Sequence, residues 1–190
     1  VEERPKLTKM DAKVSTDKKV YEVLGKTKVN LDLVDEKGKK VSDANVKAIL
    51  STREGKKELK SKTDKEGHTS FDIDLDKEGK YVLNFDISKD TYENKSLRDV
   101  IFVTNKPIAK TGETYIGKIK ADQVDTYIAN NKPFILDIRP KSAYDRAHIK
   151  GSFNLDYNDS DFNLFLDNLS KDSSLFVVSN LIDTDNIIKE

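Results

Sequence analysis

The chain has 190 residues, enough for one large domain or for two domains of about 100 residues each. The 34 lysines and arginines balance the 34 aspartates and glutamates, so no global field attracts nucleic acid or anionic lipid. The sequence has no cysteine, which excludes disulfides, thiolate metal sites and thiol catalysis, and no run of about 18 apolar residues, so no transmembrane segment is expected.

The first residue is Val1 rather than methionine, which favours a processed or trimmed product whose leader segment has been removed. The lack of cysteine and the richness in lysine, aspartate and asparagine point the same way. We therefore expect an extracellular or cell-surface protein of a bacterium, and a lipid anchor on the removed leader is compatible with this expectation.

A period of two in hydrophobicity runs from about Thr27 to Thr104 and predicts short antiparallel strands with one wet face. Between them the sequence has DEKGKK, REGKK and two copies of DKEG, which are turn-forming segments. The pattern predicts a β-sandwich. Its inner-face residues are Val29, Leu31, Leu33, Phe71, Ile73, Leu75, Tyr81, Leu83 and Phe85.

Three motifs within this region resemble bacterial Ig-like and carboxypeptidase-regulatory-like modules. They are a D-x-x-G-x-x-V-x-x-A-x-V hairpin, a T-D-x-x-G turn and a G-x-Y strand. The resemblance implies an Ig-like fold and a role as a spacer or adhesive domain. The matching residues are Asp35, Gly38, Val41, Ala44 and Val46, then Thr63, Asp64 and Gly67, then Gly79 and Tyr81.

After residue 105 the period changes, following a linker with proline, glycine and small polar residues at 106–116. The helical spacing of Val124, Tyr127 and Ile128 predicts a helix, and the short apolar run at 134–138 predicts a buried parallel strand. Another helix is predicted with Ser160 as its N-cap and Phe162, Phe165, Leu166 and Leu169 on its apolar face. A second buried strand at 175–178 and a last helix capped by Thr184 complete a parallel α/β unit.

The segment FILDIRPKSAYDRAHIKGSFNL resembles the first half of a rhodanese domain, whose pattern is D-x-R, a short helix with a tyrosine, and H-I-x-G-A/S-x-N. The predicted architecture is therefore multidomain: an all-β Ig-like sandwich at 1–105, a linker at 106–116, and an α/β rhodanese-like parallel-sheet domain at 117–190. The matching residues are Asp137, Arg139, Tyr144, His148, Ile149, Gly151, Ser152 and Asn154.

The resemblance also locates the position where a rhodanese carries sulfur on a cysteine, directly after the second strand. Here that position is Asn180, or Ser179 if the register slips, and neither side chain becomes a thiolate. The two acids of the loop would repel thiosulfate or phosphate, and one occupies the family's basic position. The inactive equivalents of the active-site loop are Ser179, Asn180, Leu181, Ile182, Asp183, Thr184 and Asp185.

Rhodanese domains continue with another strand and a terminal helix, so we expect this domain to be incomplete at its C-terminus. A parallel sheet that lacks a strand leaves an open edge, which predicts pairing with a protein partner or with another copy of the chain.

Single residues that suggest chemistry have simpler interpretations. His148 is expected to hold a turn rather than act as a base, Arg139 to pair with a carboxylate near the strand end, and Asp137 to hold the same loop. His68 follows a turn glycine and is expected to be solvated.

Other candidate sites are weaker still. Calcium-binding spacing fails in DIDLDKEG and in DYNDSDFN, because lysine and aspartate stand where the loop requires glycine. The basic stretch 53–65 lacks interleaved aromatic residues, which favours a solvated loop over a nucleic-acid site. An intramolecular cross-link between Lys28 or Lys47 and Asn84 or Asn94 has no support from spacing alone. No metal or cofactor is expected.

Two functions follow. The first is a non-catalytic binding or scaffold protein of the cell envelope. The alternative is an enzyme or enzyme subunit related to sulfurtransferases, whose thiol is supplied by a partner. Nucleic-acid binding is disfavoured by the neutral net charge.

Overall fold

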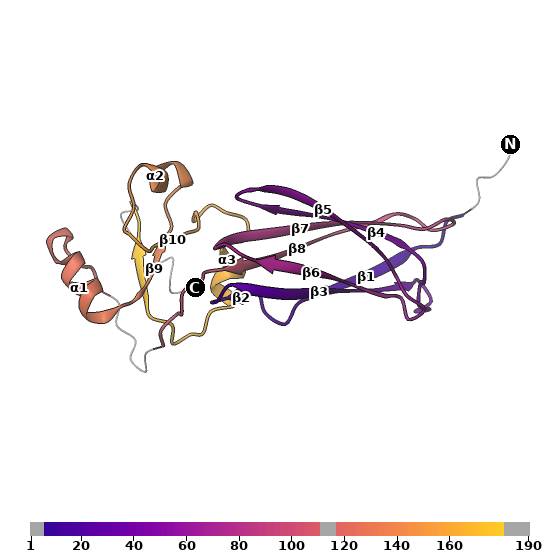
Figure 1. Ribbon diagram of the computed structural model, residues 1–190, viewed down its shortest axis with the longest axis horizontal. Coiled ribbons are helices and arrows are strands. Elements are labelled where there is room, and N and C mark those ends of the chain that lie inside the picture. Colours follow the sequence, from indigo (N-terminus) through magenta and orange to yellow (C-terminus); the bar gives the residue numbers. More distant parts are fainter. Residues whose placement is uncertain (1–5, 111–116, 181–190) are drawn as a thin grey trace. The chain divides into compact units, whose positions relative to one another are not determined.

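The computed structural model describes residues 6–110 and 117–180, and its two compact units divide between Val103 and Thr104. The N-terminal unit is a sandwich of a sheet β1-β3-β6 and a sheet β2-β8-β7-β4-β5 (Figure 1). Its strands are β1 (Met10–Ser15), β2 (Val20–Tyr21), β3 (Gly25–Asp35), β4 (Asn45–Thr52), β5 (Gly55–Lys62), β6 (His68–Leu75), β7 (Gly79–Ser88) and β8 (Lys95–Val103).

The strand order is that of an Ig-like domain. Strands β3 and β6 pair in one sheet, and β4, β7 and β8 are neighbours in the other, as the B–E and C–F–G strands are in immunoglobulins. The first strand pairs with β3, after which the chain changes sheets and β2 runs parallel to β8. The predicted Ig-like sandwich is confirmed, and β1 and β2 are two strands that lie before the region of clear alternation.

The core lies between the two sheets, where alternate residues of each strand meet. All nine residues predicted for the inner face are at most 5% exposed. Phe71 of β6 and Phe85 of β7 contact each other across the sandwich, with ring centroids 5.9 Å apart. Period-two hydrophobicity therefore selected the correct face of each of these strands.

The motif residues hold the turns of the sandwich through side-chain bonds to the backbone. The Asp35 carboxylate accepts hydrogen bonds from the N–H groups of Lys37 and Lys39. The buried Thr63 hydroxyl donates to the carbonyl of Val41 and accepts from the N–H of Ala44. Each of these bonds satisfies a main-chain group that would otherwise be left without a partner at a turn.

Gly67 is required by both its conformation and its surroundings. Its φ is +71°, and a Cβ atom there would lie 2.4 Å from the carbonyl oxygen of Leu33 on β3. The same region is tied by a hydrogen bond of 2.8 Å from Leu33 N–H to the Gly67 carbonyl. Gly38 has a similar φ of +78°, but its Cβ would meet nothing within 4 Å.

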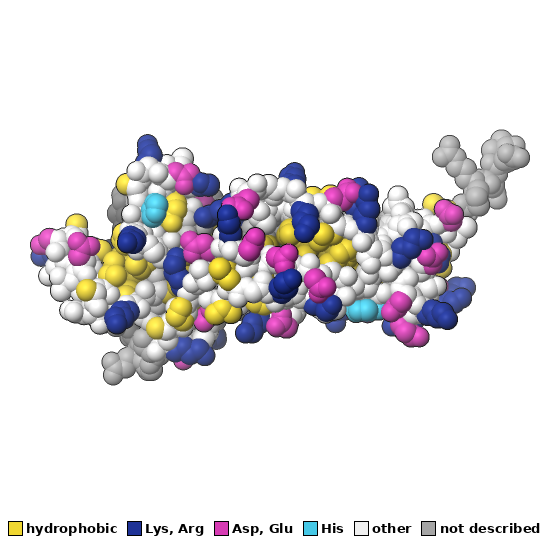
Figure 2. Space-filling model, in the orientation of Figure 1, with side chains coloured by type: hydrophobic (Ala, Val, Ile, Leu, Met, Phe, Trp, Pro, Cys, Tyr) yellow, Lys and Arg dark blue, Asp and Glu magenta, His cyan; other side chains and the backbone are white. Residues whose placement is uncertain are grey.

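Charged side chains on β6 face solvent, on the face opposite to its buried residues. Asp72 and Asp74 form ion pairs with Lys28 and Lys26 of the neighbouring β3. Figure 2 shows lysine, arginine and acidic side chains interspersed over the face in view. His68, expected to be solvated, has a side chain that is 40% exposed; it lies opposite Asp32 in the β3–β6 register, and its Nδ1 is 3.0 Å from Asp32 Oδ1.

The basic stretch forms a strand rather than the predicted loop. A tight turn at Arg53 and Glu54 reverses the chain, and β5 pairs along its length with β4. β5 is the edge of its sheet, so its lysines can face water while the backbone completes the ladder. The lysines of this strand are Lys56, Lys57, Lys60 and Lys62.

The change of sheet between β1 and β2 is held by three side chains. The buried Tyr21 hydroxyl donates to Asp17, and Tyr21 and Thr27 share a hydrogen bond of 2.7 Å. The pKa of Asp17 is lowered from its ordinary value, chiefly because Tyr21 donates to its carboxylate.

The C-terminal unit is built on a parallel sheet of order β10-β9-β11 (Figure 1). Its strands are β9 (Phe134–Asp137), β10 (Phe153–Asn154) and β11 (Leu175–Val178), and its helices are η1 (Ala121–Gln123), α1 (Val124–Asn131), α2 (Lys141–Arg146) and α3 (Phe162–Asp167). Every residue of the central strand β9 is buried. Phe153 packs between Phe134 and Phe165 at centroid distances of 6.1 and 5.6 Å, stacked on Phe165 and tilted against Phe134.

This unit confirms the predicted parallel α/β class, with local corrections. The N-cap of α3 is Asp161 instead of Ser160, because Asp159 accepts from the N–H groups of Asp161 and Phe162 and delays the entry to the helix. The helix ends at Asp167, before Leu169. Strand β10 was not predicted from periodicity. The expected helix beginning at Thr184 lies outside the described residues.

None of the described helices has the length and apolar character to span a bilayer.

Replacing Gly67 by alanine is expected to destabilise the sandwich far more than replacing Gly38. Both substitutions force a left-handed conformation, at about 1–2 kcal/mol each, but only Gly67→Ala adds a clash, for about 1–3 kcal/mol more. Urea unfolding of both variants, followed by circular dichroism, measures the difference. Equal losses of unfolding free energy in the two variants would show that the backbone near Leu33 shifts to accommodate the added methyl group without an energetic penalty.

Removing the Tyr21 hydroxyl should make the sandwich less stable in a pH-dependent way. Since the pKa of Asp17 is lowered by folding, its ionised form adds stability above the unfolded pKa of about 4, and this contribution is lost as pH falls through the folded value. Tyr21→Phe should cost of the order of 1 kcal/mol at neutral pH and less in acid. Urea unfolding at several pH values tests this, and a pH-independent difference would contradict it.

Candidate functional site

The carboxyl ends of the parallel strands meet at one edge of the C-terminal sheet, where α/β proteins place ligands and reactive groups. Strand β9 ends there at Asp137, β10 at Asn154, and β11 at Val178, followed by Ser179 and Asn180. The remaining loop positions proposed from the sequence, Leu181, Ile182, Asp183, Thr184 and Asp185, lie outside the described residues.

Asp137 is fully buried and is neutralised by Arg139. The guanidinium donates to both carboxylate oxygens, from Nε to Oδ1 at 3.0 Å and from Nη2 to Oδ2 at 2.6 Å, and Arg139 N–H also donates to Oδ1. These hydrogen bonds raise the pKa of Arg139 above its ordinary value. Arg139 thus pairs with a carboxylate at the strand end, as predicted, and Asp137 holds the loop.

A further bond from Arg139 ties this pair to the end of α2. Nη2 donates to the carbonyl of Ala147 at 2.8 Å. Asn154 closes the other side, because its Nδ2 donates to the carbonyls of Asp137 and Arg139 at 3.0 and 2.8 Å. The D-x-R and Asn154 positions therefore form one network whose donors are directed to protein carbonyls and to one carboxylate.

Tyr144 and His148 stabilise the turn that follows α2. Their rings stack at a centroid distance of 4.0 Å, and His148 Nδ1 lies 2.9 Å from the carbonyl of Tyr144. The Tyr144 hydroxyl donates to the carbonyl of Ser152. Gly151 takes a φ of +84° in this turn, a conformation that disfavours other residues. The contacts of His148 are those of a turn residue, and its ring is exposed.

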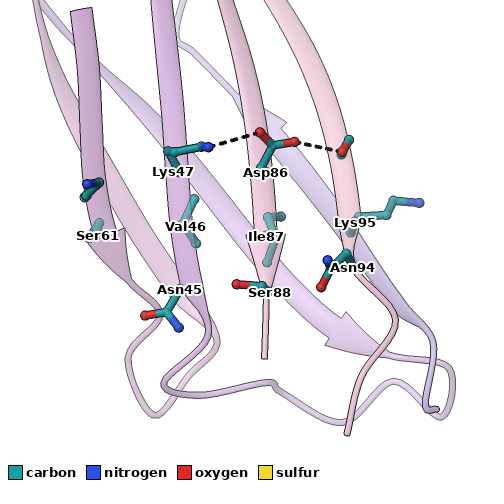
Figure 3. Close-up of a pocket in the computed structure, with 11 residues that line it drawn as sticks. Asn45, Val46, Lys47, Ser61, Asp86, Ile87, Ser88, Asn94 and Lys95 are labelled. Atoms are coloured by element: carbon teal, nitrogen blue, oxygen red, sulfur yellow. Dashed lines mark hydrogen bonds and ion pairs between the residues drawn. The ribbon is translucent and has the colours of Figure 1, made fainter. Parts of the chain in front are cut away.

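A second concave site is an open groove on the outer face of the sheet β2-β8-β7-β4-β5 (Figure 3), with a cavity volume of about 590 Å³. Lys47 points toward Asp86, with 3.8 Å between Nζ and Oδ2, and Ser96 donates to Asp86 at 2.9 Å. The lining residues are Asn45, Val46, Lys47, Lys60, Ser61, Asp86, Ile87, Ser88, Asn94, Lys95 and Ser96.

The groove brings Lys47 and Asn94 to one site, which are two of the residues considered for a cross-link. The side chains of Lys47 and its acidic neighbour Asp86 are 45% and 61% exposed. The burial that such a cross-link needs is therefore missing here. Lys28 lies on β3 of the other sheet, paired with Asp72.

Within residues 6–110 and 117–180, no three histidine or acidic side chains are grouped so as to hold a metal ion.

Comparison with protein families decides the nature of the C-terminal unit. Residues 120–185 match the rhodanese-like domain. The C-terminal unit is a rhodanese-like domain. Because the whole chain has no cysteine, this domain has no residue on which sulfur could be carried as a persulfide, so the usual sulfurtransferase chemistry is not available to it.

Solved structures resemble the chain only weakly. They include the superoxide reductase (neelaredoxin) of Ignicoccus hospitalis, with 13% identity over 48% of this chain and 79% of that one and a TM-score of 0.40. The CARDB domain of PF1109 from Pyrococcus furiosus has 14% identity, coverages of 53% and 99%, and a score of 0.39. The PKD domain of an M14-like peptidase from Thermoplasmatales archaeon SCGC AB-540-F20 has 10% identity, coverages of 53% and 98%, and a score of 0.35.

With scores this low, the assignment of the Ig-like sandwich depends on its own strand order. No curated protein matches the chain.

Sequence reasoning found the motif residues of the rhodanese-like domain but missed the groove. Alternation places Lys47 and Asp86 on outer faces, yet the groove also requires the register that sets β4 beside β7. That register is fixed by pairing between segments distant in the sequence, and no local signal reports it.

Removing the Arg139 guanidinium should destabilise the rhodanese-like domain strongly. Arg139→Met leaves the carboxylate of Asp137, which is 0% exposed, without its counter-charge, a loss of about 3–5 kcal/mol. Adding Asp137→Asn should recover part of the loss. Native-state hydrogen exchange of the β9 amides measures the opening energy of this domain alone. A loss of opening free energy below about 1 kcal/mol would mean that the Asp137–Arg139 ion pair contributes little to the stability of the domain.

Proposed function

We propose that this chain is a non-catalytic binding or scaffold protein of the bacterial cell envelope. In this proposal the Ig-like module acts as a stalk or adhesive unit, and the rhodanese-like domain is an inactive binding unit. The observation that carries the proposal is the absence of cysteine from a chain that contains a rhodanese-like domain.

The residues at the reactive position support loss of activity. Asn180, at the position that the resemblance assigns to the cysteine, has an amide that does not ionise to a nucleophile. The neighbouring Ser179 could not take its place, because a serine hydroxyl cannot carry sulfane sulfur. Asp183 and Asp185 add negative charge where a rhodanese attracts an anion.

The edge strand β11 supports the binding role. The N–H groups of Phe134 and Ile138 donate to the carbonyls of Ser174 and Val178. Since main-chain groups alternate along a strand, the groups of Leu175 and Val177 are directed away from β9. Within residues 6–110 and 117–180 no strand pairs with this outer side; just before β11, an isolated bridge joins Lys110 to Ser173, and Ser174 N–H donates to the carbonyl of Ala109.

The side chains of β11 are consistent with a surface that another chain covers. All four residues are only half-buried, whereas every residue of the neighbouring strand β9 is buried. Helix α1 has no buried residue of its own, although Tyr127 contacts Phe176 at a centroid distance of 5.7 Å. An added strand from a protein partner or from a second copy would bury this apolar edge.

The envelope assignment is supported only by composition: a cysteine-free chain rich in lysine, aspartate and asparagine. Cell fractionation with an antibody to the chain tests it, together with the lipid anchor, which would shift the intact mass. Recovery of the protein from the cytosol alone would reject the assignment.

The chain should have no thiosulfate:cyanide sulfurtransferase activity, and Asn180→Cys should restore little, because Asp183 and Asp185 would still repel thiosulfate. The double variant Asn180→Cys/Asp185→Arg should transfer sulfur faster than Asn180→Cys, because arginine attracts the anion that aspartate repels. Transfer is measured by thiocyanate formation and by the gain of sulfur in intact mass. Activity of the unaltered chain alone would overturn the proposal. Activity only on adding a thiol protein would favour the partner-supplied thiol.

Proline at an outward and at an inward position of β11 should separate the effect on binding from the effect on folding. Val177→Pro removes an N–H that is directed away from β9 and should leave the domain folded, whereas Val178→Pro should break a β9–β11 hydrogen bond. Sedimentation of the full chain over a range of concentrations tests self-association, and Val177→Pro should abolish any that occurs. If Val177→Pro unfolds the domain as much as Val178→Pro, the edge is not open.

A further inference from the structure

The groove of Figure 3 lies on the face of four strands that are neighbours in the sheet, β8, β7, β4 and β5. Side chains, rather than main-chain groups, form its surface. Strand β4 pairs with β5 and β7, β7 pairs with β4 and β8, and β8 pairs with β7 and β2. The main-chain groups of the central strands β4 and β7 are therefore engaged in ladders on both sides, whereas β5 is the edge of the sheet and β8 pairs with β2 only at Phe102 and Val103. An extended peptide that binds by adding a strand has no place between β4 and β7, so the middle of the groove can bind a ligand only through side chains.

The charges of the groove are unevenly distributed. Lys47 and Lys60 lie directly opposite each other in the β4–β5 register, an arrangement in which like charges repel. Lys60 is paired with Glu58 at 2.7 Å, but Lys47 reaches Asp86 only at 3.8 Å. Three lysines and one aspartate line the groove, and the acidic partners of Lys60 and Lys95, Glu58 and Asp11, lie outside its lining.

Lys47 and Lys60 each have a carboxylate partner, but their side chains are 45% and 74% exposed and exposed ion pairs are weak, so a ligand can compete for both. In Figure 3 the third, Lys95, extends away from Asp86, and its Nζ lies 3.8 Å from Asp11 of β1. An anionic group seated between Lys47 and Lys60 would relieve their repulsion and form charge-assisted hydrogen bonds with both.

Uncharged polar groups surround this pair. Asn45, Ser88 and Asn94 are exposed at the end of the groove where β4 begins and β7 ends (Figure 3). Amide and hydroxyl groups both donate and accept hydrogen bonds, which suits the hydroxyl groups of a sugar, since each of these also donates and accepts.

We propose that this groove of the Ig-like module binds an anionic saccharide, a sugar that carries carboxylate or phosphate groups. Lys47 and Lys60 hold the anionic group, and Asn45, Ser88 and Asn94 bind the sugar hydroxyls. The proposal goes beyond the role of the rhodanese-like domain and does not depend on it. Because the groove is exposed and has no aromatic residue among those that line it, binding is weak and falls as salt rises.

Calorimetric titration of the full chain tests the proposal with four probes. Oligogalacturonate presents carboxylates and glucose 6-phosphate presents phosphate, so together they distinguish the two sources of charge. Maltotriose is the neutral sugar, and poly-glutamate is the acidic peptide. Binding of at least one anionic sugar, with maltotriose and poly-glutamate much weaker, is the expected result. Absence of binding by both anionic sugars, or equal binding of poly-glutamate, would overturn the proposal.

Matched lysine variants locate the binding. Lys47→Gln and Lys60→Gln each remove one exposed charge and should weaken binding of the anionic sugar about tenfold. Lys26→Gln is the control, because Lys26 is exposed and ion-paired with Asp74 on the other sheet, and it should leave affinity unchanged. Equal affinities for all three variants and the unaltered chain would place the ligand elsewhere and reject the groove.

Discussion

The rhodanese-like domain depends on one buried charge, the carboxylate of Asp137. It ends the central strand β9 with no exposure to solvent, and it is stable there only because Arg139 neutralises it with a bidentate pair. The same short segment binds its neighbours through main-chain groups, since the Asp137 carbonyl accepts from both Asn154 Nδ2 and Leu155 N–H. This network joins β9, β10 and α2 without using any residue as a reagent.

The scaffold and the chemistry of this fold are therefore separable. Tyr144, His148 and Gly151 keep the turn after α2, and their contacts are with protein atoms. The reaction of the family requires one further residue, a thiol directly after the strand that corresponds to β11, and the sequence has none. Loss of that residue removes a function without removing a single contact of the Asp137 network.

Much of the fold could be predicted because the information is local. Alternation fixed the inner faces of β3, β6 and β7, and turn motifs located Gly67, whose neighbour Leu33 explains the requirement for glycine. Strand β10 has two residues and no measurable period. The N-cap of α3 moved because the carboxylate of Asp159 accepts from the backbone one residue before the helix. The groove depends on long-range register, which periodicity does not contain.

The edge strands β5 and β11 differ in charge, and this difference affects the tendency of the protein to aggregate at high concentration. Aligning β5 strands of two molecules would bring lysine against lysine along the shared edge, and the resulting repulsion discourages fibrous assembly. Strand β11 has the sequence LFVV and no such barrier. Any ordered growth of the protein into larger assemblies should therefore begin at the C-terminal sheet, and a single lysine introduced there would improve its solubility.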